Sequence, residues 1–161
     1  MKSYWMNISD GQGQMELREV DRPVPGAGQV LVKLHAAALN RGELIIGHGL
    51  HGQGGSKPAG MEGAGQIVQL GRETGAWQLG DRVMGRCPGA FSEYALMDVR
   101  EIMRVPDNLT LEQAASIPLT FLVTYDLLVQ QGKLKTNDWM LINGVSSGVG
   151  VASLQMGKAL G

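Results

Sequence analysis

The chain has one cysteine, Cys87, almost no net charge and no long apolar run, and each of these shortages excludes a class of protein. A single cysteine allows no internal disulfide and no cysteine-rich metal cluster. With 14 Lys and Arg against 15 Asp and Glu, the net charge of −1 predicts no nucleic-acid partner. No stretch reaches the roughly 18 apolar residues of a membrane helix, and Met1–Asn7 is too polar for a signal peptide. We therefore expect a cytoplasmic protein that does not bind membranes.

Glycine, in contrast, is abundant, with 24 residues in a chain of 161. That is about twice the usual share and predicts many tight turns. Apolar residues make up 43% of the chain and charged residues 18%, which suits a globular protein with a buried core.

The first part of the chain, to about residue 105, has the pattern of short β-strands separated by turn residues. Val30–Ala38 alternates most regularly, with Val30 and Val32 on one face and Lys33 and His35 on the other. Further strands are expected at residues 4–8, 15–20, 65–70, 82–84, 92–97 and 102–105. This spacing predicts a small all-β barrel or sandwich. A short helix is expected over 40–46, and the glycine-rich segment 48–57 is expected to be the most mobile loop.

The pattern changes to helical after residue 105. Thr110 followed by Gln113 is a capping-box spacing, which predicts a helix over 111–117 that Pro118 interrupts. A second helix is expected over 120–134, with Leu residues recurring on one face and Gly132 near its end. We place a domain boundary after residue 118.

The last segment has the order strand, glycine turn, helix. Trp139–Ile142 is a short apolar run, Gly144, Gly148 and Gly150 follow, and apolar residues then recur at helical spacing to Leu160. A turn of this kind lets backbone N–H groups at a helix N-terminus approach a pyrophosphate. Ordinary close packing of a strand and a helix remains the alternative. No Lys-Ser or Lys-Thr follows the glycines, which excludes a lysine-bearing P-loop.

Six segments in this order resemble the N-terminal half of a medium-chain dehydrogenase/reductase, and specifically the zinc-independent quinone oxidoreductase branch, also called zeta-crystallin-like. These segments are Pro23–Lys33, Ala36–Asn40, Gly60–Val68, Gly80–Gly85, Ala114–Thr120 and the glycine turn with Lys158–Gly161. The resemblance implies a mixed α and β fold: a GroES-like β-barrel domain over 1–118, followed by the first βα unit of an incomplete Rossmann domain over 119–161. It also implies NADPH as cofactor, a small-molecule substrate and a homodimer of the intact protein.

The same resemblance bears on zinc. Zinc-dependent relatives carry a Cys at the position of Asn40 and a His at the position of Met61, because catalytic zinc needs thiolate and imidazole ligands. We therefore expect no zinc and no alcohol dehydrogenase that depends on a Lewis acid.

The resemblance implies catalytic roles for Asn40 and His51. The expected cofactor-binding residues are Asn40, Thr120, Thr124, Ser146, Ser147, Gly148, Val149 and Gly150. Each has a structural alternative: Asn40 suits a helix N-cap, and the two threonines suit helix packing. His51 is a candidate proton donor or substrate contact, and a metal site shared with His48 is disfavoured because no third ligand is near in sequence. Glu62 is expected to pair with a neighbouring Arg inside the barrel, and Cys87 to have no role.

The function expected on this basis is hydride transfer from NADPH to a quinone, an enone or an enoyl thioester by a longer parent chain. Two alternatives stay open. One is a non-catalytic GroES-like fragment or interaction module without cofactor binding, and the other is an alcohol dehydrogenase-like member of the same superfamily. A lone βα unit also leaves the apolar face of its helix partly exposed and prone to association.

Overall fold

The computed structural model describes residues 1–9, 12–44 and 55–161, and the chain divides into two compact units, Met1–Ser116 and Ile117–Gly161. The sequence placed this boundary two residues later, after residue 118. The first unit contains β1 (Lys2–Ser9), β2 (Gln12–Glu19), β3 (Gln29–Ala37), α1 (Arg41–Leu44), β4 (Gly55–Pro58), β5 (Glu62–Leu70), β6 (Arg82–Arg86), β7 (Tyr94–Asp98), β8 (Ile102–Arg104) and α2 (Leu111–Ala115). The second unit contains α3 (Pro118–Tyr125), the π-helical segment η1 (Asp126–Gln131) and α4 (Gly148–Leu160).

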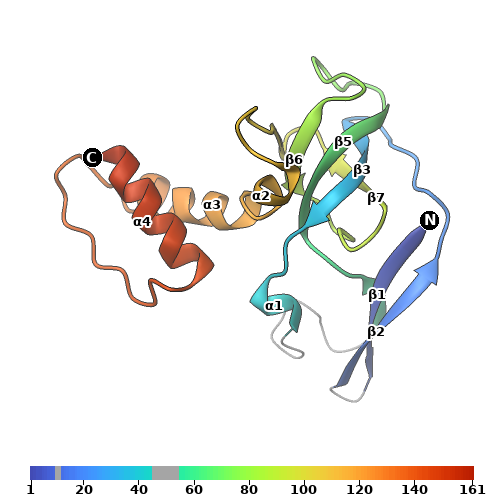
Figure 1. Cartoon of the computed structure of the whole chain (residues 1–161), viewed down its shortest axis with the longest axis horizontal. Helices are drawn as coiled ribbons and strands as arrows, with labels where there is room; N and C mark the ends of the chain where they lie inside the picture. The colour runs from blue at the N-terminus through green and yellow to red at the C-terminus, as the bar shows by residue number, and fades with distance from the viewer. Residues whose placement is uncertain (10–11, 45–54) are drawn as a thin grey trace. The chain divides into compact units, whose positions relative to one another are not determined.

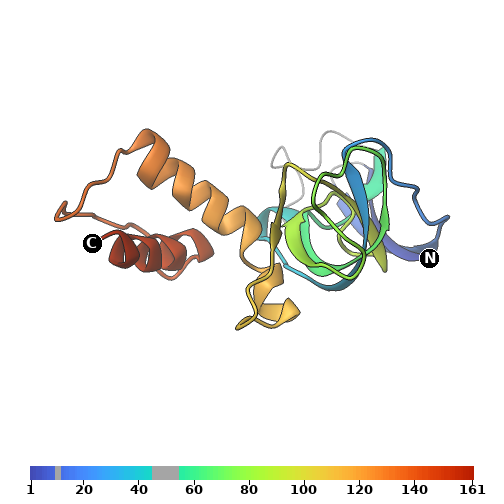
Figure 2. The same cartoon turned by 90° about the horizontal axis from the view of Figure 1, so that it is seen from above.

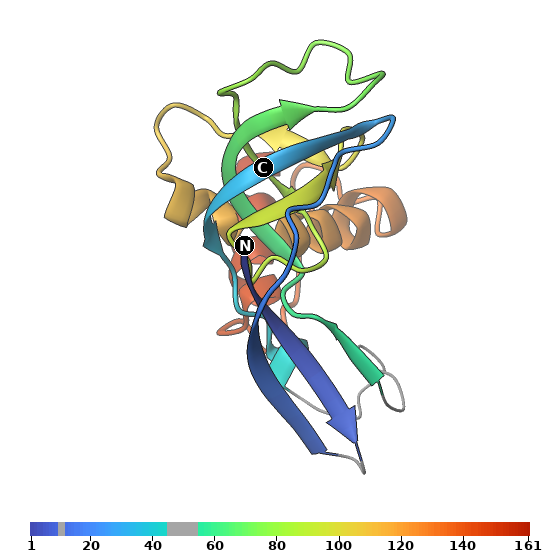
Figure 3. The same ribbon diagram turned by 90° about the vertical axis from the view of Figure 1, so that its right-hand side faces the viewer.

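A curved five-stranded antiparallel sheet, in the order β7-β3-β5-β6-β8, forms the body of the first unit (Figures 1 and 3). Its core is made by Val30 and Val32 of β3, Ile67 of β5, Val83 of β6 and Met97 of β7, all buried. Val30 and Val32 lie on the same face of β3, and Leu31 on its opposite face is also buried, at 1% exposure. The predicted strand over Val30–Ala38 and the all-β character of this part are confirmed.

A second, smaller antiparallel sheet has the order β2-β1-β4, and Figure 3 shows it as a separate set of strands. Residues 55–57 were expected to belong to a mobile loop, and this expectation is wrong. They form β4, where Lys57 pairs with Met6 and Ser56 with Asn7 of β1. The strand forms because β1 offers an open edge whose backbone groups need partners.

The capping box predicted from Thr110 and Gln113 is present at the start of α2. The Gln113 backbone N–H donates to the Thr110 hydroxyl oxygen at 3.2 Å, and the Thr110 backbone N–H donates to the Gln113 Oε1 atom at 3.0 Å. The helix packs against β3, β5 and β6. It ends at Ala115, two residues earlier than predicted, and places the buried Ala114 and Ala115 against the sheet.

In the second unit, the single helix predicted over 120–134 is wrong in detail. The α-helix α3 starts at Pro118. Proline is tolerated there because a backbone N–H in the first turn would have no acceptor within the helix. The chain then continues as the π-helical segment η1, in which the Gly132 N–H donates to the Leu127 carbonyl at 2.9 Å. The predicted helix after the glycine turn is confirmed as α4, which packs alongside α3 (Figure 2).

The strand predicted at Trp139–Ile142 does not form. A strand needs a neighbour that takes up its backbone hydrogen bonds, and no described residue of this unit supplies one. The side chains of Trp139 and Leu141 are instead 101% and 89% exposed. Within the described residues, no helix has both the length and the apolar character needed to cross a bilayer.

Candidate functional site

Asn40 lies between the end of β3 and the start of α1, and two buried carboxyl groups hold it. Its backbone N–H donates to Glu43 Oε2 at 2.7 Å, and its side-chain Nδ2 donates to Glu62 Oε1 at 3.0 Å. Glu62 is 1% exposed and Glu43 is 4% exposed, whereas Asn40 itself is partly exposed. The main chain and the side chain of Asn40 are therefore anchored separately.

The N-cap interpretation of Asn40 holds only for its backbone. The Glu43 N–H donates to the Asn40 backbone carbonyl at 3.0 Å, and Glu43 reaches back to the Asn40 N–H as in half of a capping box. The Asn40 amide does not cap the helix, because it is turned toward Glu62. The side chain is thus available for a role other than capping.

The Glu62 carboxylate accepts a hydrogen bond from the Asn40 amide, and its expected pairing with a neighbouring arginine stays a prediction. Glu62 also acts on Cys87. Burial, and then the negative charge of Glu62, raise the pKa of the buried Cys87 thiol to about 12. Cys87 therefore stays a protonated thiol near neutral pH, and its lack of a role stays a prediction.

A cavity of about 190 Å³ shares Glu43 with this site. Apolar side chains make up most of its wall, with charged groups at Glu43, Lys57 and Arg86; the apolar members are Met6, Met15, Met61, Pro58, Pro88 and Phe91. A mostly apolar wall with a few polar groups is typical of small-molecule sites, although this cavity is smaller than the roughly 300 Å³ at which such sites begin.

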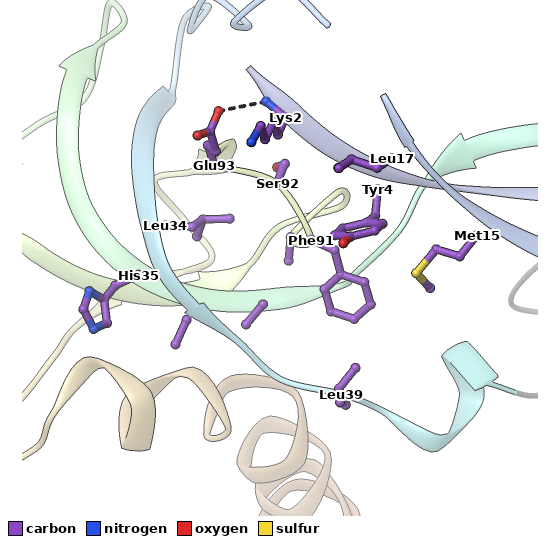
Figure 4. A pocket seen from close by; sticks show the side chains of 13 residues that line it. Lys2, Tyr4, Met15, Leu17, Leu34, His35, Leu39, Phe91, Ser92 and Glu93 are labelled. Carbon is purple, nitrogen blue, oxygen red and sulfur yellow. Dashed lines mark hydrogen bonds between the residues drawn. The ribbon is translucent and has the colours of Figure 1, made fainter. Parts of the chain in front are cut away.

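A larger groove of about 540 Å³ lies between β1, β2 and the end of β3 (Figure 4). The rings of Tyr4 and Phe91 and the side chain of Leu34 line it. The Glu93 carboxylate at its edge already accepts the Lys2 backbone N–H at 2.8 Å. The groove offers apolar surface more than polar chemistry, so Asn40 is the stronger candidate in this unit.

The glycine turn forms the start of α4 in the second unit. The Ser147 hydroxyl oxygen accepts the Gly150 N–H at 3.1 Å, so Ser147 is the N-cap of the helix. No described residue accepts a hydrogen bond from the N–H of Gly148 or Val149. These two donors and the hydroxyl hydrogen of Ser147 are available to an anion, while Ser146 is exposed beside them.

The two glycines at the start of α4 differ in how much space a side chain would have. A Cβ atom at Gly150 would lie 2.5 Å from the Gly144 carbonyl oxygen and 2.6 Å from the Val145 Cα atom. A Cβ atom at Gly148 would meet only Thr120, at 3.7 Å. Gly150 is therefore required for packing of the turn, whereas a Cβ atom at Gly148 would make only ordinary van der Waals contact with Thr120.

Thr120 and Thr124 lie in the first two turns of α3. Thr124 is fully buried, and its hydroxyl donates to the Thr120 backbone carbonyl at 2.8 Å. That hydrogen bond is the helix-packing alternative weighed for Thr124. Thr120 is partly exposed, and its side chain lies 3.7 Å from the position of a Cβ atom on Gly148, which keeps it as a candidate.

His51 and its neighbour His48 lie outside the described residues, so nothing is added to their predicted roles. Among the residues that the structure describes, no three His, Cys, Asp or Glu side chains gather as metal ligands would. Sequence reasoning missed Glu43, although Asn40-x-x-Glu43 has the capping-box spacing that could have revealed it.

The family model of the alcohol dehydrogenase GroES-like domain matches residues 26–107, about half of the chain. The chain belongs to this family. Its GroES-like unit is the N-terminal domain of the medium-chain dehydrogenase/reductase superfamily, so the resemblance inferred from the sequence motifs is confirmed.

The similarity to proteins of named activity covers nearly the whole chain. Human quinone oxidoreductase is 31% identical over 156 residues, which are 94% of this chain and 47% of that protein. A mycobacterial protein solved in complex with NADPH is 27% identical, with a TM-score of 0.88 over 100% of this chain and 51% of its own. The enoyl reductase CurK is 26% identical, with a TM-score of 0.85 over 98% and 52%. The GroES-like chain thus spans about half the length of these relatives.

Proposed function

We propose that this chain is part of a zinc-independent reductase that transfers hydride from NADPH to a quinone, an enone or an enoyl thioester. The observation that carries the proposal is the likeness, over the whole chain, to a protein solved with NADPH. The likenesses to a quinone oxidoreductase and to an enoyl reductase support the same class of substrate, an electrophile that accepts hydride.

The start of α4 fits a dinucleotide pyrophosphate. The N–H groups of Gly148 and Val149 and the hydroxyl of Ser147 would hold it, aided by the positive end of the helix dipole. Gly148 has no side chain of its own to keep a phosphate away from the backbone N–H groups. Ser147, which stands where the family usually has a glycine, both caps the helix and keeps a donor for the ligand.

Zinc independence is supported by the chemistry of the side chains at the relevant positions. Asn40 is engaged with Glu62 through its amide, and Met61 supplies a thioether in place of an imidazole.

NADPH, when bound, supplies the hydride, so the protein needs to align and enclose the reactants rather than provide a nucleophile. Asn40 would orient a polar group of cofactor or substrate beside the barrel. His51 stays the predicted source of the proton that follows the hydride. A homodimer of the intact protein and a cytoplasmic location also stay predictions.

The test uses a parent protein that contains this chain. Loss of NADPH absorbance is followed with a panel of quinones, enones and enoyl thioesters, before and after treatment with a strong zinc chelator. We expect turnover that the chelator leaves unchanged. Alcohol oxidation that the chelator abolishes would favour the alcohol dehydrogenase alternative. The absence of both turnover and NADPH binding would favour the non-catalytic module.

A further inference from the structure

We propose that Glu62 is a positioning residue that fixes the amide orientation of Asn40, so that Asn40 Oδ1 is presented as an acceptor to a ligand group that donates a hydrogen bond. The contact between Asn40 Nδ2 and Glu62 Oε1, at 3.0 Å, carries the proposal. Its consequence for catalysis rests on the proposed function, whereas the orientation itself does not.

The orientation follows from the hydrogen-bonding capacity of the two groups. An asparagine amide has an NH₂ donor on one branch and a carbonyl acceptor on the other, while an ionised carboxylate accepts only. With Glu62 at the end of the Asn40 side chain, the NH₂ branch must face the carboxylate and the oxygen must lie on the other branch. A charge-assisted hydrogen bond of this kind is about twice as strong as one between neutral groups.

Burial makes the arrangement specific. Glu62 is 1% exposed and is held on β5, which pairs with both β3 and β6, so the carboxylate has little freedom to move. Glu43 holds the Asn40 backbone N–H from the other direction, at 2.7 Å. Two anchors on different atoms of Asn40 leave the side chain a single orientation.

The Asn40 Oδ1 atom, which the two anchoring hydrogen bonds do not use, determines which ligand group can bind. Asn40 is partly exposed, and no described residue donates to its Oδ1 atom. The oxygen is therefore ready to accept from a hydroxyl or a carboxamide N–H of a bound molecule. A ligand that offers only acceptors would meet an acceptor and would bind less well.

The test measures the side-chain amide of Asn40 by NMR in the 161-residue chain without cofactor. In the wild type we expect two well-separated amide proton resonances that exchange with solvent about tenfold or more slowly than those of the exposed Asn108. In the Glu62→Gln variant, and more strongly in Glu62→Met, the protection should fall and the resonances should move toward those of Asn108. Glu62→Asp, which keeps the carboxylate on a shorter arm, should restore part of the protection.

Glu43→Gln is the matched control, because Glu43 contacts the backbone of Asn40 and not its amide. It should shift the Asn40 backbone resonance and leave the side-chain pair protected. The proposal is overturned if the wild-type Asn40 amide exchanges like that of Asn108, a result that needs no variant to fold. It is also overturned if a folded Glu62→Met variant keeps the wild-type protection.

The same variants in the parent enzyme separate this inference from the proposed function. We expect Glu62→Gln to lower kcat/KM for NADPH-dependent turnover by about tenfold in protein that is still folded at the assay temperature, with partial recovery in Glu62→Asp. If the amide signature holds but the parent has no reductase activity, the proposed function fails and the positioning stands. An intact reductase whose kcat/KM is unaffected by Glu62→Gln would contradict the catalytic consequence.

Discussion

The hydroxyl oxygen of Ser147 accepts the backbone N–H of Gly150 at 3.1 Å, so one side chain closes the first turn of α4. Loss of an N-cap hydroxyl typically costs about 1 kcal/mol. We expect Ser147→Ala to destabilise α4 by about that amount, measured as faster hydrogen exchange of its backbone amides. Ser146→Ala is the control, because Ser146 is exposed and its side chain makes no hydrogen bond to any described residue. Equal effects of the two variants would show that the cap is not the cause.

Gly148 and Gly150 form a matched pair in which the same substitution should act differently. In Gly150→Ala the new methyl group would collide with the Gly144 carbonyl and the Val145 backbone, and overpacking of this kind costs roughly 1–3 kcal/mol. Gly148→Ala should be close to neutral in stability, since its methyl group meets only Thr120 at 3.7 Å. Thermal unfolding checks both.

Gly148→Ala should have a large effect on ligand binding, in contrast to its small effect on stability. On the proposed function, its methyl group fills the space that a phosphate would occupy, so Gly148→Ala should weaken NADPH binding to the parent protein by about tenfold or more. Fluorescence titration with NADPH measures this effect. Unchanged binding in Gly148→Ala would remove α4 as the pyrophosphate site.

The Arg104 guanidinium lies 2.8 Å from the Asp81 carboxylate and 4.7 Å from the centre of the Trp77 ring. The hydrogen bond from Arg104, and then that from the Gln78 backbone, hold the pKa of Asp81 below its ordinary value. Because the folded pKa is depressed, the stabilisation is fully present above the unfolded pKa of about 4 and is lost as the pH falls through the lower folded value.

We therefore expect Asp81→Asn to be less stable than the wild type near pH 7, and the difference to shrink as the pH falls below the unfolded pKa of about 4. Chemical denaturation followed by tryptophan fluorescence gives the comparison. Asp107→Asn is the control, since Asp107 is exposed and makes no ion pair with any described residue. A stability difference that stays constant with pH would show that the Asp81 charge is not responsible.

Trp139 and Leu141 are almost fully exposed in the segment that leads to the glycine turn. Large apolar side chains presented to water favour association. We expect the isolated 161-residue chain to associate with increasing concentration, and the double variant Trp139→Ser with Leu141→Ser to stay monomeric to higher concentration without loss of thermal stability. Sedimentation velocity checks this. Equal association of the wild type and the double variant would show that another surface mediates it, for example the half-exposed Val151 and Leu154 of α4.

Local sequence patterns predicted the elements whose formation depends on neighbours in sequence. The alternation along Val30–Ala38 and the capping box of Thr110 and Gln113 both appear in the structure, as does the helix after the glycine turn. The family resemblance rested on motifs of the same local kind, and the match to residues 26–107 confirms it.

The remaining features depend on partners that are distant in sequence. Trp139–Ile142 has the composition of a buried strand but no strand beside it, so composition alone misled. Residues 55–57 look like a loop but complete the edge of β1. The contact of Asn40 with Glu62 spans 22 residues and joins the loop after β3 to β5, whose pairing register with β3 no local pattern determines. The switch to a π-helix after Tyr125 has no sequence signal that we can identify.

The burial of Cys87 turns the only thiol of the chain into an internal reporter of barrel opening. A thiol that is fully buried and has a pKa of about 12 cannot react with an alkylating reagent until the strands around it separate. The rate of alkylation therefore measures how often the GroES-like unit opens, separately from events in the α-helical unit. Because no second cysteine competes for the reagent, one mass shift per molecule counts each opened chain.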